Sequence, residues 1–427
     1  MRRDVRVCGS CPSGAAGRRG LKQDMSSRPR RRRGVALLRL ATALALAANG
    51  AWAANAAAPS EQGRGAALLA SLAARRAELD MRGIALGGFV QLDGSHVLSG
   101  GVPHSLSFDA QRLLDLALTL DTDKLLGWPG GTLFLDAQSH SGANVITHQV
   151  PALADPDNMD AYAETSLDRA WFEQDLLGRK LAVRVGLMYV DDQFFTVPFG
   201  QNFLSLDFSS DASISTFVLP TYPKGAWGAD AFLDPSHALS FSLGVFRDHE
   251  TELPYDPGGQ LIVSEEAWRG RWRGLALRLQ VGGWVDTGRF QRFEGGVAHR
   301  AAGAYLIASG RLWQSAGSGD RGIGAFVQYG SAPPAVAAVR QHFGAGLVWS
   351  GPWAARPHDE LGIAYSDSML SGAARFTHSF ESEVEAYYQI DASHGWTVQP
   401  DLEYWEHPGG ADTPATLLGL IRIMLTF

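Results

Sequence analysis

The C-terminal stretch Leu417–Phe427 has the sequence LLGLIRIMLTF, an apolar run interrupted by one arginine and ending in phenylalanine. Successive side chains of a β-strand point to opposite faces, so Arg422 lies on the other side of such a strand from Ile421 and Ile423. The stretch therefore predicts a strand with two distinct faces. The apolar face carries Leu417, Gly419, Ile421, Ile423, Leu425 and Phe427, and the other carries Thr416, Arg422, Met424 and Thr426.

The same alternation recurs along the chain. Residues 113–123, LLDLALTLDTD, place leucine at every second position, and residues 132–140, TLFLDAQSH, repeat the pattern. The faces opposite the apolar ones carry charged, amide or hydroxyl groups. Further segments of this kind are KLAVRVGLMYV (180–190), HALSFSLGVF (237–246), GLALRLQVGGW (274–284) and SEVEAYYQID (382–391).

Short turns and long loops alternate between these segments. Short connections fall near 124–130, 177–179, 234–237, 274, 315–320, 351–359 and 392–395, and longer ones near 98–108, 141–164, 193–224, 249–264, 287–300, 332–339, 368–376 and 406–413. A soluble sandwich also alternates, but its connections have no such order between its two ends. The layout predicts an all-β fold, a transmembrane antiparallel barrel of about sixteen strands, with fourteen or eighteen as alternatives.

The N-terminal region has the features of an export signal. Arg28–Arg33 form a basic segment, 35–48 an apolar one, and Ala51-Trp52-Ala53 a cleavage site. We expect residues 1–24 to precede the true start at Met25, 25–53 to be a signal peptide, 54–82 to be a helical segment lying in the periplasm, and 83–427 to be the barrel. Helix formers and spaced leucines predict the helix at 61–80.

Charge and cysteine content restrict the function. Residues 1–53 hold 12 of the 37 Lys and Arg but only two of the 44 Asp and Glu, which leaves 25 bases and 42 acids, a net charge of about −17, on the remainder. Such an acidic chain lacks the basic surface that nucleic acid requires. Both cysteines, Cys8 and Cys11, lie in the leader, so thiol chemistry has no place in the exported protein.

Several blocks of sequence resemble the carbohydrate-selective outer-membrane porins, the OprB-type family. They are RRAELDMRGIAL, LTLDTDKLLGWPGGTLFLDAQSHSG, RAWFEQDLLGRKLAVRVG, LPTYPKGAWGADAFLDP, GPWAARPHDELGIAYS and VQPDLEYWEHPGG, followed by the closing strand. The resemblance spans about residues 70–427. It implies a sixteen-stranded barrel for passive sugar diffusion, with inturned loops and a narrow eyelet of polar and aromatic side chains. Residues 188–210, MYVDDQFFTVPFGQNFLSLDFSS, depart from the family pattern and are expected to shape the constriction.

Sugar recognition needs hydrogen-bonding groups and an aromatic plane at close range. Arg169, Trp171 and Glu173 share one face of a strand and meet both needs. Alternatively, Arg169 and Glu173 neutralise one another and Trp171 packs at the membrane boundary. Other candidates for the pore lining are Arg184, Asp115, Asp136, Gln138, Glu383, Glu385, Gln399 and Asp401, each of which could equally be a solvated wall residue.

Tryptophans near the short turns predict an aromatic girdle: Trp128, Trp353 and Trp396, together with Phe427. Asp155, Asp157, Asn158 and Asp160 could hold calcium, although a solvated acidic loop is the simpler interpretation. His140 and His148 have no partner at zinc-site spacing. No nucleophile elbow, HExxH or phosphate-binding loop follows residue 53.

The sequence thus predicts a passive sugar porin of the bacterial outer membrane that needs no cofactor. A general or cation-selective porin on the same barrel is the alternative, and a hydrolase at the barrel rim is a more distant one. Expected partners are small sugars, outer-membrane lipid and lipopolysaccharide, and the barrel-assembly machinery through Phe427. The chain is expected to be a monomer or a trimer.

Overall fold

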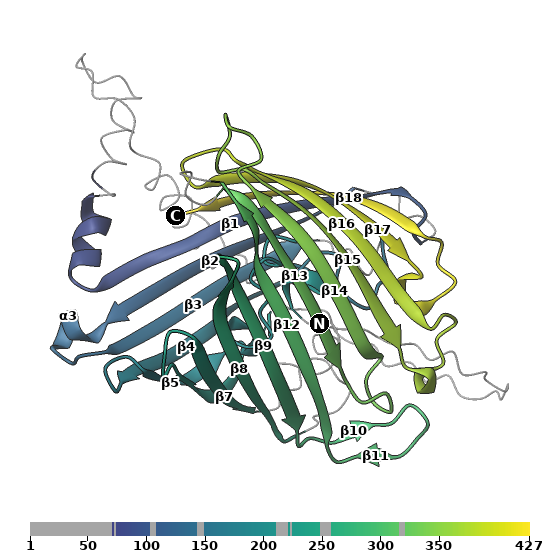
Figure 1. Ribbon diagram of the computed structural model, residues 1–427, viewed down its shortest axis with the longest axis horizontal. Coiled ribbons are helices and arrows are strands. Elements are labelled where there is room, and N and C mark those ends of the chain that lie inside the picture. Colours follow the sequence, from purple (N-terminus) through teal and green to yellow (C-terminus); the bar gives the residue numbers. More distant parts are fainter. Residues whose placement is uncertain are drawn as a thin grey trace, which may run out of the picture.

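A computed structural model describes residues 71, 74–102, 108–142, 149–210, 221–222, 224–247, 258–315 and 321–427. Within these ranges the chain forms a closed antiparallel barrel of sixteen strands (Figure 1). The predicted signal peptide and start site, Cys8, Cys11 and His148 lie outside the described residues.

Each barrel strand pairs with its neighbour in the sequence, and β12 pairs with β9 across the small hairpin β10–β11. The barrel strands are β1 (Ile84–Ser99), β2 (Asp109–Asp121), β3 (Gly131–Gly142), β4 (Glu164–Leu176), β5 (Leu181–Met188), β6 (Ala226–Leu233), β7 (Leu239–Arg247), β8 (Gln260–Trp272), β9 (Leu275–Asp286), β12 (Ala301–Gln314), β13 (Gly322–Ser331), β14 (Val339–Ser350), β15 (Glu360–Leu370), β16 (Phe380–Asp391), β17 (Trp396–Glu406) and β18 (Thr416–Thr426); the hairpin is β10 (Phe290–Gln291) and β11 (Val297–Ala298).

The last strand closes the barrel against the first. β1 and β18 pair in register from Phe89 opposite Thr426 to Ser99 opposite Leu417. Beyond the strand, the Phe427 N–H donates to the Gly88 carbonyl at 3.0 Å and the Gly88 N–H donates back at 3.1 Å. The predicted two-faced closing strand is confirmed: Arg422 lies opposite Asp93 on the inner face.

Short turns and long loops occupy opposite ends of the barrel, as predicted. One short connection contains α3 (Thr122–Leu126), which begins at the Asp121 cap and ends at the left-handed Gly127. Residues 74–81 form the described part of the predicted N-terminal helix. They lead into β1 beside α3, where the Asp121 N–H donates to Gly83. The remaining short helices are η1 (Val190–Asp192), α5 (Leu206–Ser209), η2 (Gly372–Ala374) and η3 (Pro408–Gly410).

None of the helices in the described ranges is long and apolar enough to cross a membrane.

Aromatic side chains collect at the end with the short turns. The predicted girdle residues Trp128, Trp353 and Trp396 are 55%, 53% and 42% exposed there. Trp272 and Trp313, at the ends of β8 and β12, are also exposed at this end. Phe427 differs because it is buried, packing with Leu425, Val90 and Leu116 on the outer face of the closure. An exposed tryptophan ring suits the boundary between lipid and water.

The largest hydrophobic core lies inside the barrel. Residues 189–210, between β5 and β6, bring four buried phenylalanines (Phe194, Phe195, Phe203 and Phe208) against inward-facing side chains of the wall. Phe195 packs on Tyr305, and Phe203 packs on Phe326 and Tyr387. Over this part of the wall the inward face carries apolar side chains, in contrast to the charged, amide and hydroxyl groups that the alternating segments show opposite their apolar faces. Apolar inward residues are needed where a loop, rather than water, fills the interior.

The opposite faces of β7 offer a test of the barrel. Leu243 is 52% exposed and points outward, whereas its neighbour Ser242 points inward, opposite Glu265 of β8. An arginine facing the hydrocarbon midplane destabilises outer-membrane barrels by about 2–4 kcal/mol. Leu243→Arg should therefore lower the free energy of unfolding in lipid vesicles by about that amount, as measured by denaturant titration.

Ser242→Arg is the matched control, with the same charge at the same depth on the inner face and close to the Glu265 carboxylate. Ser242→Arg should lower the free energy of unfolding much less than Leu243→Arg does. Equal losses for the two variants would contradict the assignment of faces.

Candidate pore constriction

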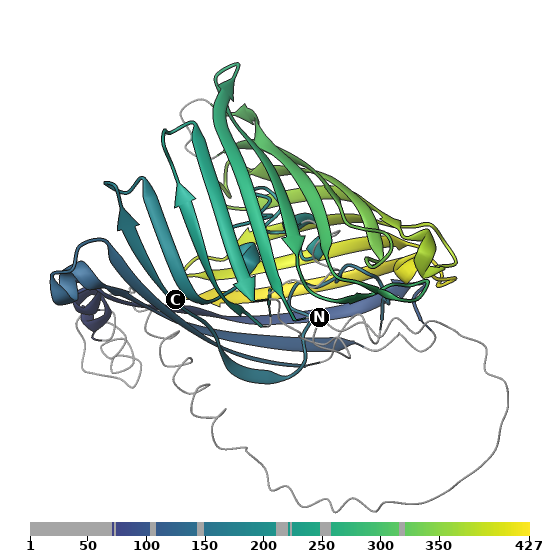
Figure 2. The ribbon, with the colours of Figure 1, turned by 90° about the horizontal axis from the view of Figure 1, so that it is seen from below.

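Two segments fold from the long-loop end into the barrel: residues 149–163, between β3 and β4, and residues 189–210, between β5 and β6 (Figure 2). In the first segment, the Leu153 and Ala154 backbone N–H groups donate to the Glu381 carboxylate at 2.8 and 3.1 Å. Its apolar residues pack on Trp405, Leu418 and Leu420 of the inner wall. Leu418 and Leu420 are the inward apolar residues of the closing strand.

The acidic residues of the first segment are buried, not solvated. Asp155 and Asp157 are each 1% exposed. Arg422 donates to Asp157 at 3.0 Å and to the Asn158 side chain at 2.8 Å, and Gln111 donates to Asp157 at 2.9 Å. Burial and the nearby Asp93 carboxylate hold the pKa of Asp157 well above its ordinary value, against the opposing effect of Arg422. The solvated-loop interpretation is therefore wrong, and Arg422 supplies the positive charge that a calcium ion would have brought.

The second segment is fixed to the wall through Asp207 in α5. Its backbone carbonyl accepts hydrogen bonds from Gln328 at 2.5 Å and contacts His342 Nε2 at 3.1 Å, and its carboxylate accepts from Ser366 at 2.5 Å. All of these groups are buried. The Ser205 hydroxyl caps α5 by accepting from the Asp207 N–H. Three wall strands, β13, β14 and β15, therefore determine where this segment sits.

Arg169 of β4 joins the wall to the second segment. Its guanidinium lies 2.5 Å from the Asp136 carboxylate, 3.0 Å from Asp192 in η1 and 3.9 Å from Asp115. It also lies 5.1 Å from the centre of the Tyr189 ring. Burial raises the pKa of Asp192, and Arg169 and Arg184 act in the opposite direction. The Arg169 and Asp192 side chains each remain 21% exposed, so this bridge is accessible inside the barrel.

A row of flat groups continues from this bridge along the wall. Trp171 stacks on Phe134 with centroids 4.9 Å apart, and the Arg184 guanidinium lies 5.2 Å from both the Trp171 and Phe232 rings. Gly186, which lies opposite Trp171 and has φ +150°, permits this packing, because a Cβ there would lie 2.5 Å from the Trp171 Cα.

The alternative in which Arg169 and Glu173 neutralise one another is wrong. Glu173 is half-buried and lies opposite Arg184 in the β4–β5 register. Arg184 instead pairs with the buried Asp230 of β6 through bonds of 3.0 and 2.5 Å. Trp171 faces inward beside Arg184, whereas the exposed rim tryptophans point outward. The alternative that placed Trp171 in the membrane girdle is therefore wrong.

The other predicted wall residues are chiefly buried and form hydrogen bonds with neighbouring side chains or with the backbone of the second inturned segment. Gln138 donates to Asp115 at 2.9 Å and lies 3.4 Å from Asp136. Glu383 and Glu385 accept hydrogen bonds from Ser205 and Leu204 of the second segment, and Gln399 donates to the Asn202 carbonyl. His140 contacts Gln111 and the Tyr162 carbonyl. Asp401 is buried beside the Glu385 carboxylate.

The sequence-based prediction missed Tyr189, Asp192 and Asp230, all of which contact the predicted arginines. Strand periodicity does not extend to loop residues, so Asp192 had no assigned face, whereas Tyr189 stands at the end of the alternating segment 180–190. The local signal was nevertheless present, since Tyr189 and the acids Asp191 and Asp192 directly follow β5 in the segment that departs from the family pattern.

A closed sixteen-stranded barrel with an apolar exterior, aromatic rim and inturned loops defines an outer-membrane porin. Residues 107–427 match the family model described as carbohydrate-selective porin, OprB family. The chain belongs to this family. It is an outer-membrane channel for the passive diffusion of sugars.

Individual relatives are distant. Porin B of Pseudomonas aeruginosa is 19% identical over 73% of this chain and 80% of its own length, and the putative porin QuiX of Acinetobacter baylyi is 21% identical over 78% and 82%. The high-pH structure of Pseudomonas putida OprB superposes with a TM-score of 0.77 at 19% identity, covering 84% of this chain and 98% of that one. Its low-pH structure gives a TM-score of 0.59 at 16% identity. These structural likenesses support the fold.

Asp191 should make the second inturned segment sensitive to pH. Burial raises the pKa of this carboxyl group from 3.8 to about 6, although Thr221 donates a hydrogen bond to it. An acid with a raised pKa in the folded state stabilises that state when protonated, so the stabilisation is complete below 3.8 and is lost as the pH rises through about 6. Residues 189–210 should therefore exchange amide hydrogens more slowly at about pH 5 than at about pH 7, after correction for intrinsic exchange.

Asp191→Asn imitates the protonated side chain and should remove much of this difference. Asp412→Asn, at an exposed position in another loop, should leave it unchanged. An undiminished pH response in Asp191→Asn would contradict the assignment.

Proposed function

We propose that sugars are selected at the constriction between the β3–β6 wall and the second inturned segment, with Arg169, Trp171 and Asp192 in contact with the solute. The observation that carries this proposal is the accessible Arg169–Asp192 bridge, which spans wall and loop beside the flat row of Phe134, Trp171 and Arg184. Elsewhere in the described interior, the 189–210 segment packs against the wall through buried aromatic side chains.

The chemistry of the bridge suits a sugar. Arginine offers several N–H donors and the aspartate offers acceptors, so together they can bind neighbouring hydroxyl groups. The apolar face of a pyranose ring can lie against the aromatic row. Because Arg169 and Asp192 already satisfy one another, a passing sugar gains only a modest net free energy from replacing part of that pairing. Weak binding of this kind permits passage.

The remaining predicted pore residues support this constriction. Asp115 and Asp136 hold Arg169 in place, and Gln138 holds those two carboxylates. Arg184 is held by Asp230, which the sequence did not predict. In the second segment, Glu385 accepts from the Leu204 backbone N–H and Glu383 from the Ser205 hydroxyl. Glu173 lies beside the row and is the further candidate for contact with solute. The general or cation-selective alternative draws support from the net charge of about −17 after residue 53. Inside the barrel, Arg169, Arg184 and Arg278 each neutralise an acid of the wall or loop, and this pairing favours the sugar pathway over it.

We also propose how the chain is processed and assembled and what surrounds the barrel in the membrane. Residues 25–53 are removed on export, Phe427 is recognised by the barrel-assembly machinery, and lipid and lipopolysaccharide cover the apolar outer face. No catalytic step is assigned to the chain. Native mass spectrometry from detergent distinguishes the monomer from the trimer.

Permeation measurements test the sugar pathway directly. Proteoliposomes should swell faster with a monosaccharide than with a neutral, non-sugar solute of matched size, because only the sugar combines hydroxyl groups with a flat apolar ring face. A salt gradient across a planar bilayer should give little cation preference. Equal swelling rates combined with strong cation preference would instead establish the general porin.

Trp171→Ala tests the aromatic row. Removing the ring should lower the sugar swelling rate relative to the matched neutral solute, while single-channel salt conductance changes little or rises slightly. The control is Trp227→Ala, which deletes the same side chain from an outward-facing position that is 64% exposed. If Trp227→Ala also loses the sugar preference, or if neither variant loses it, Trp171 does not select sugars at the constriction.

A further inference from the structure

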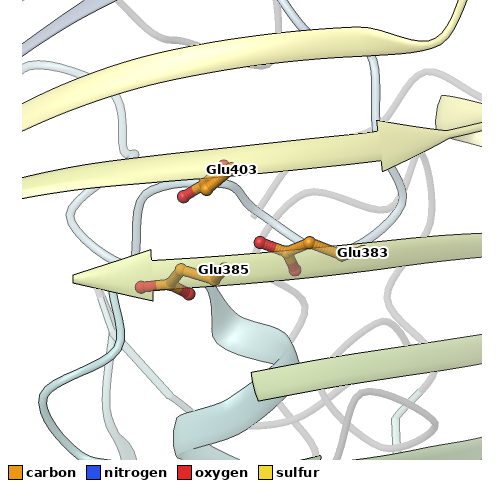
Figure 3. Close-up of side chains that lie close together, drawn as sticks. All are labelled: Glu383, Glu385 and Glu403. Carbon is orange, nitrogen blue, oxygen red and sulfur yellow. The ribbon is translucent and has the colours of Figure 1, made fainter. Parts of the chain in front are cut away.

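Three glutamates from two adjacent strands converge inside the barrel. Glu383 and Glu385 lie on β16, and Glu403 on β17 pairs directly with Glu385 (Figure 3). One carboxylate oxygen from each residue lies within 4.8 Å of one from each of the others. All three side chains are buried, at no more than 1% exposure.

Each of the three carboxylates accepts at least one hydrogen bond. Glu385 accepts from the Leu204 and Ser205 backbone N–H groups at 2.6 and 3.1 Å, and Glu383 Oε2 accepts from the Ser205 hydroxyl at 2.6 Å. Glu403 Oε2 accepts from Trp405 Nε1 at 2.8 Å. The Leu204 and Ser205 donors attach the second inturned segment to the wall, whereas Trp405 belongs to the wall itself.

The second oxygens of Glu383 and Glu403 are fully buried and accept no hydrogen bond from the described residues. Asp401 Oδ1, on the same face of β17 as Glu403, is also fully buried and accepts no hydrogen bond from the described residues. Within the described ranges, none of the three glutamates forms an ion pair with Lys, Arg or His. Buried carboxylate charges without an ionic partner are strongly unfavourable, so each must be neutralised by a proton or by a bound cation.

The geometry fits a hard divalent cation. Calcium binds oxygen ligands at about 2.3–2.6 Å, so two ligands on opposite sides of one ion lie about 4.6–5.2 Å apart. The three carboxylate oxygens lie within 4.8 Å of one another, so they are close enough to bind one such ion together. The donor set contains only oxygen, with no His or Cys in the cluster, which suits calcium better than zinc or copper. Magnesium requires a tighter octahedron and retains more water.

We propose that Glu383, Glu385 and Glu403 bind a calcium ion that clamps residues 204–205, and with them the second inturned segment, to the barrel wall. The ion neutralises the buried charge and binds the oxygens of Glu383 and Glu403 that accept no hydrogen bond, together with an oxygen of Glu385 that keeps its backbone hydrogen bond. This site is separate from the Arg169–Asp192 bridge, so it stands whether or not that bridge selects sugars. Its role is to hold the size of the opening constant.

Terbium luminescence provides a specific test, because terbium occupies calcium sites and a nearby indole sensitises its emission. Trp405 donates directly to Glu403, so the full-length protein, stripped of metal by a chelator, should show tryptophan-sensitised emission that saturates at one ion per chain. Calcium should displace that ion. Glu403→Gln should weaken calcium competition and terbium binding by more than about tenfold, the smallest loss expected from disturbing even the surroundings of a metal site.

Glu265→Gln is the matched control, since Glu265 is a single buried inward glutamate satisfied by Tyr305 and Gln280. It should bind terbium as the unaltered protein does. Folding of Glu403→Gln is checked by heat-modifiable migration in gel electrophoresis. If that variant does not fold, Glu383→Asp replaces it, because the shorter side chain keeps the negative charge but draws the carboxylate away from the ion.

If the unaltered protein shows no saturable emission, the proposal is overturned, and shared protons are then the neutralising agent. Equal terbium affinity in the control and the cluster variant would overturn it too, because the ion would then be bound elsewhere. Chelation should also increase fluctuations of the single-channel current, and added calcium should suppress them.

Discussion

Closure of the sheet is the constraint on which the rest of the structure depends. Lipid offers no hydrogen-bond partner to an exposed strand edge, so the first and last strands must pair along their length. β1 and β18 do so from Phe89–Thr426 to Ser99–Leu417. At this junction Arg422 binds Asp93 of the first strand and Asp157 of the first inturned segment. The residues that complete the barrel therefore also begin to fill it, and the position of one loop follows from closure.

The interior is divided into two chemically different regions. Against β7–β16, the second inturned segment brings its phenylalanines onto apolar wall residues, and α5 is fixed through Asp207 to β13, β14 and β15. Against β2–β6, charged pairs and flat rings remain partly accessible. Buried ion pairs such as Arg184–Asp230 add little net stability, because desolvation offsets their attraction, but they fix side-chain positions. A narrow opening needs that positional accuracy more than it needs extra stability.

Strand periodicity was sufficient to predict part of the constriction. It placed Arg169, Trp171 and Glu173 on one inward face, and it placed Glu383 and Glu385 together on another. It could not predict that Arg169 pairs with Asp192, because Asp192 lies in a loop with no regular alternation. Nor could it predict that Glu385 accepts backbone N–H groups from Leu204 and Ser205, far away in the sequence. Such contacts depend on where a folded loop comes to rest.

The sequence by itself determined the barrel, its approximate strand number, the order of turns and loops and the outward face of the clearly alternating strands. These properties follow from a local rule, since adjacent side chains in a strand meet either lipid or the interior. Only the tertiary structure decided which inward groups meet water, which meet a loop and which meet one another. The acidic stretch Asp155–Asp160 shows the difference. Its composition suggested a solvated loop, but in the structure it lies buried, and Asp157 accepts hydrogen bonds from Arg422 and Gln111 of distant strands. Long-range pairing of charges depends on three-dimensional proximity, which no local pattern encodes.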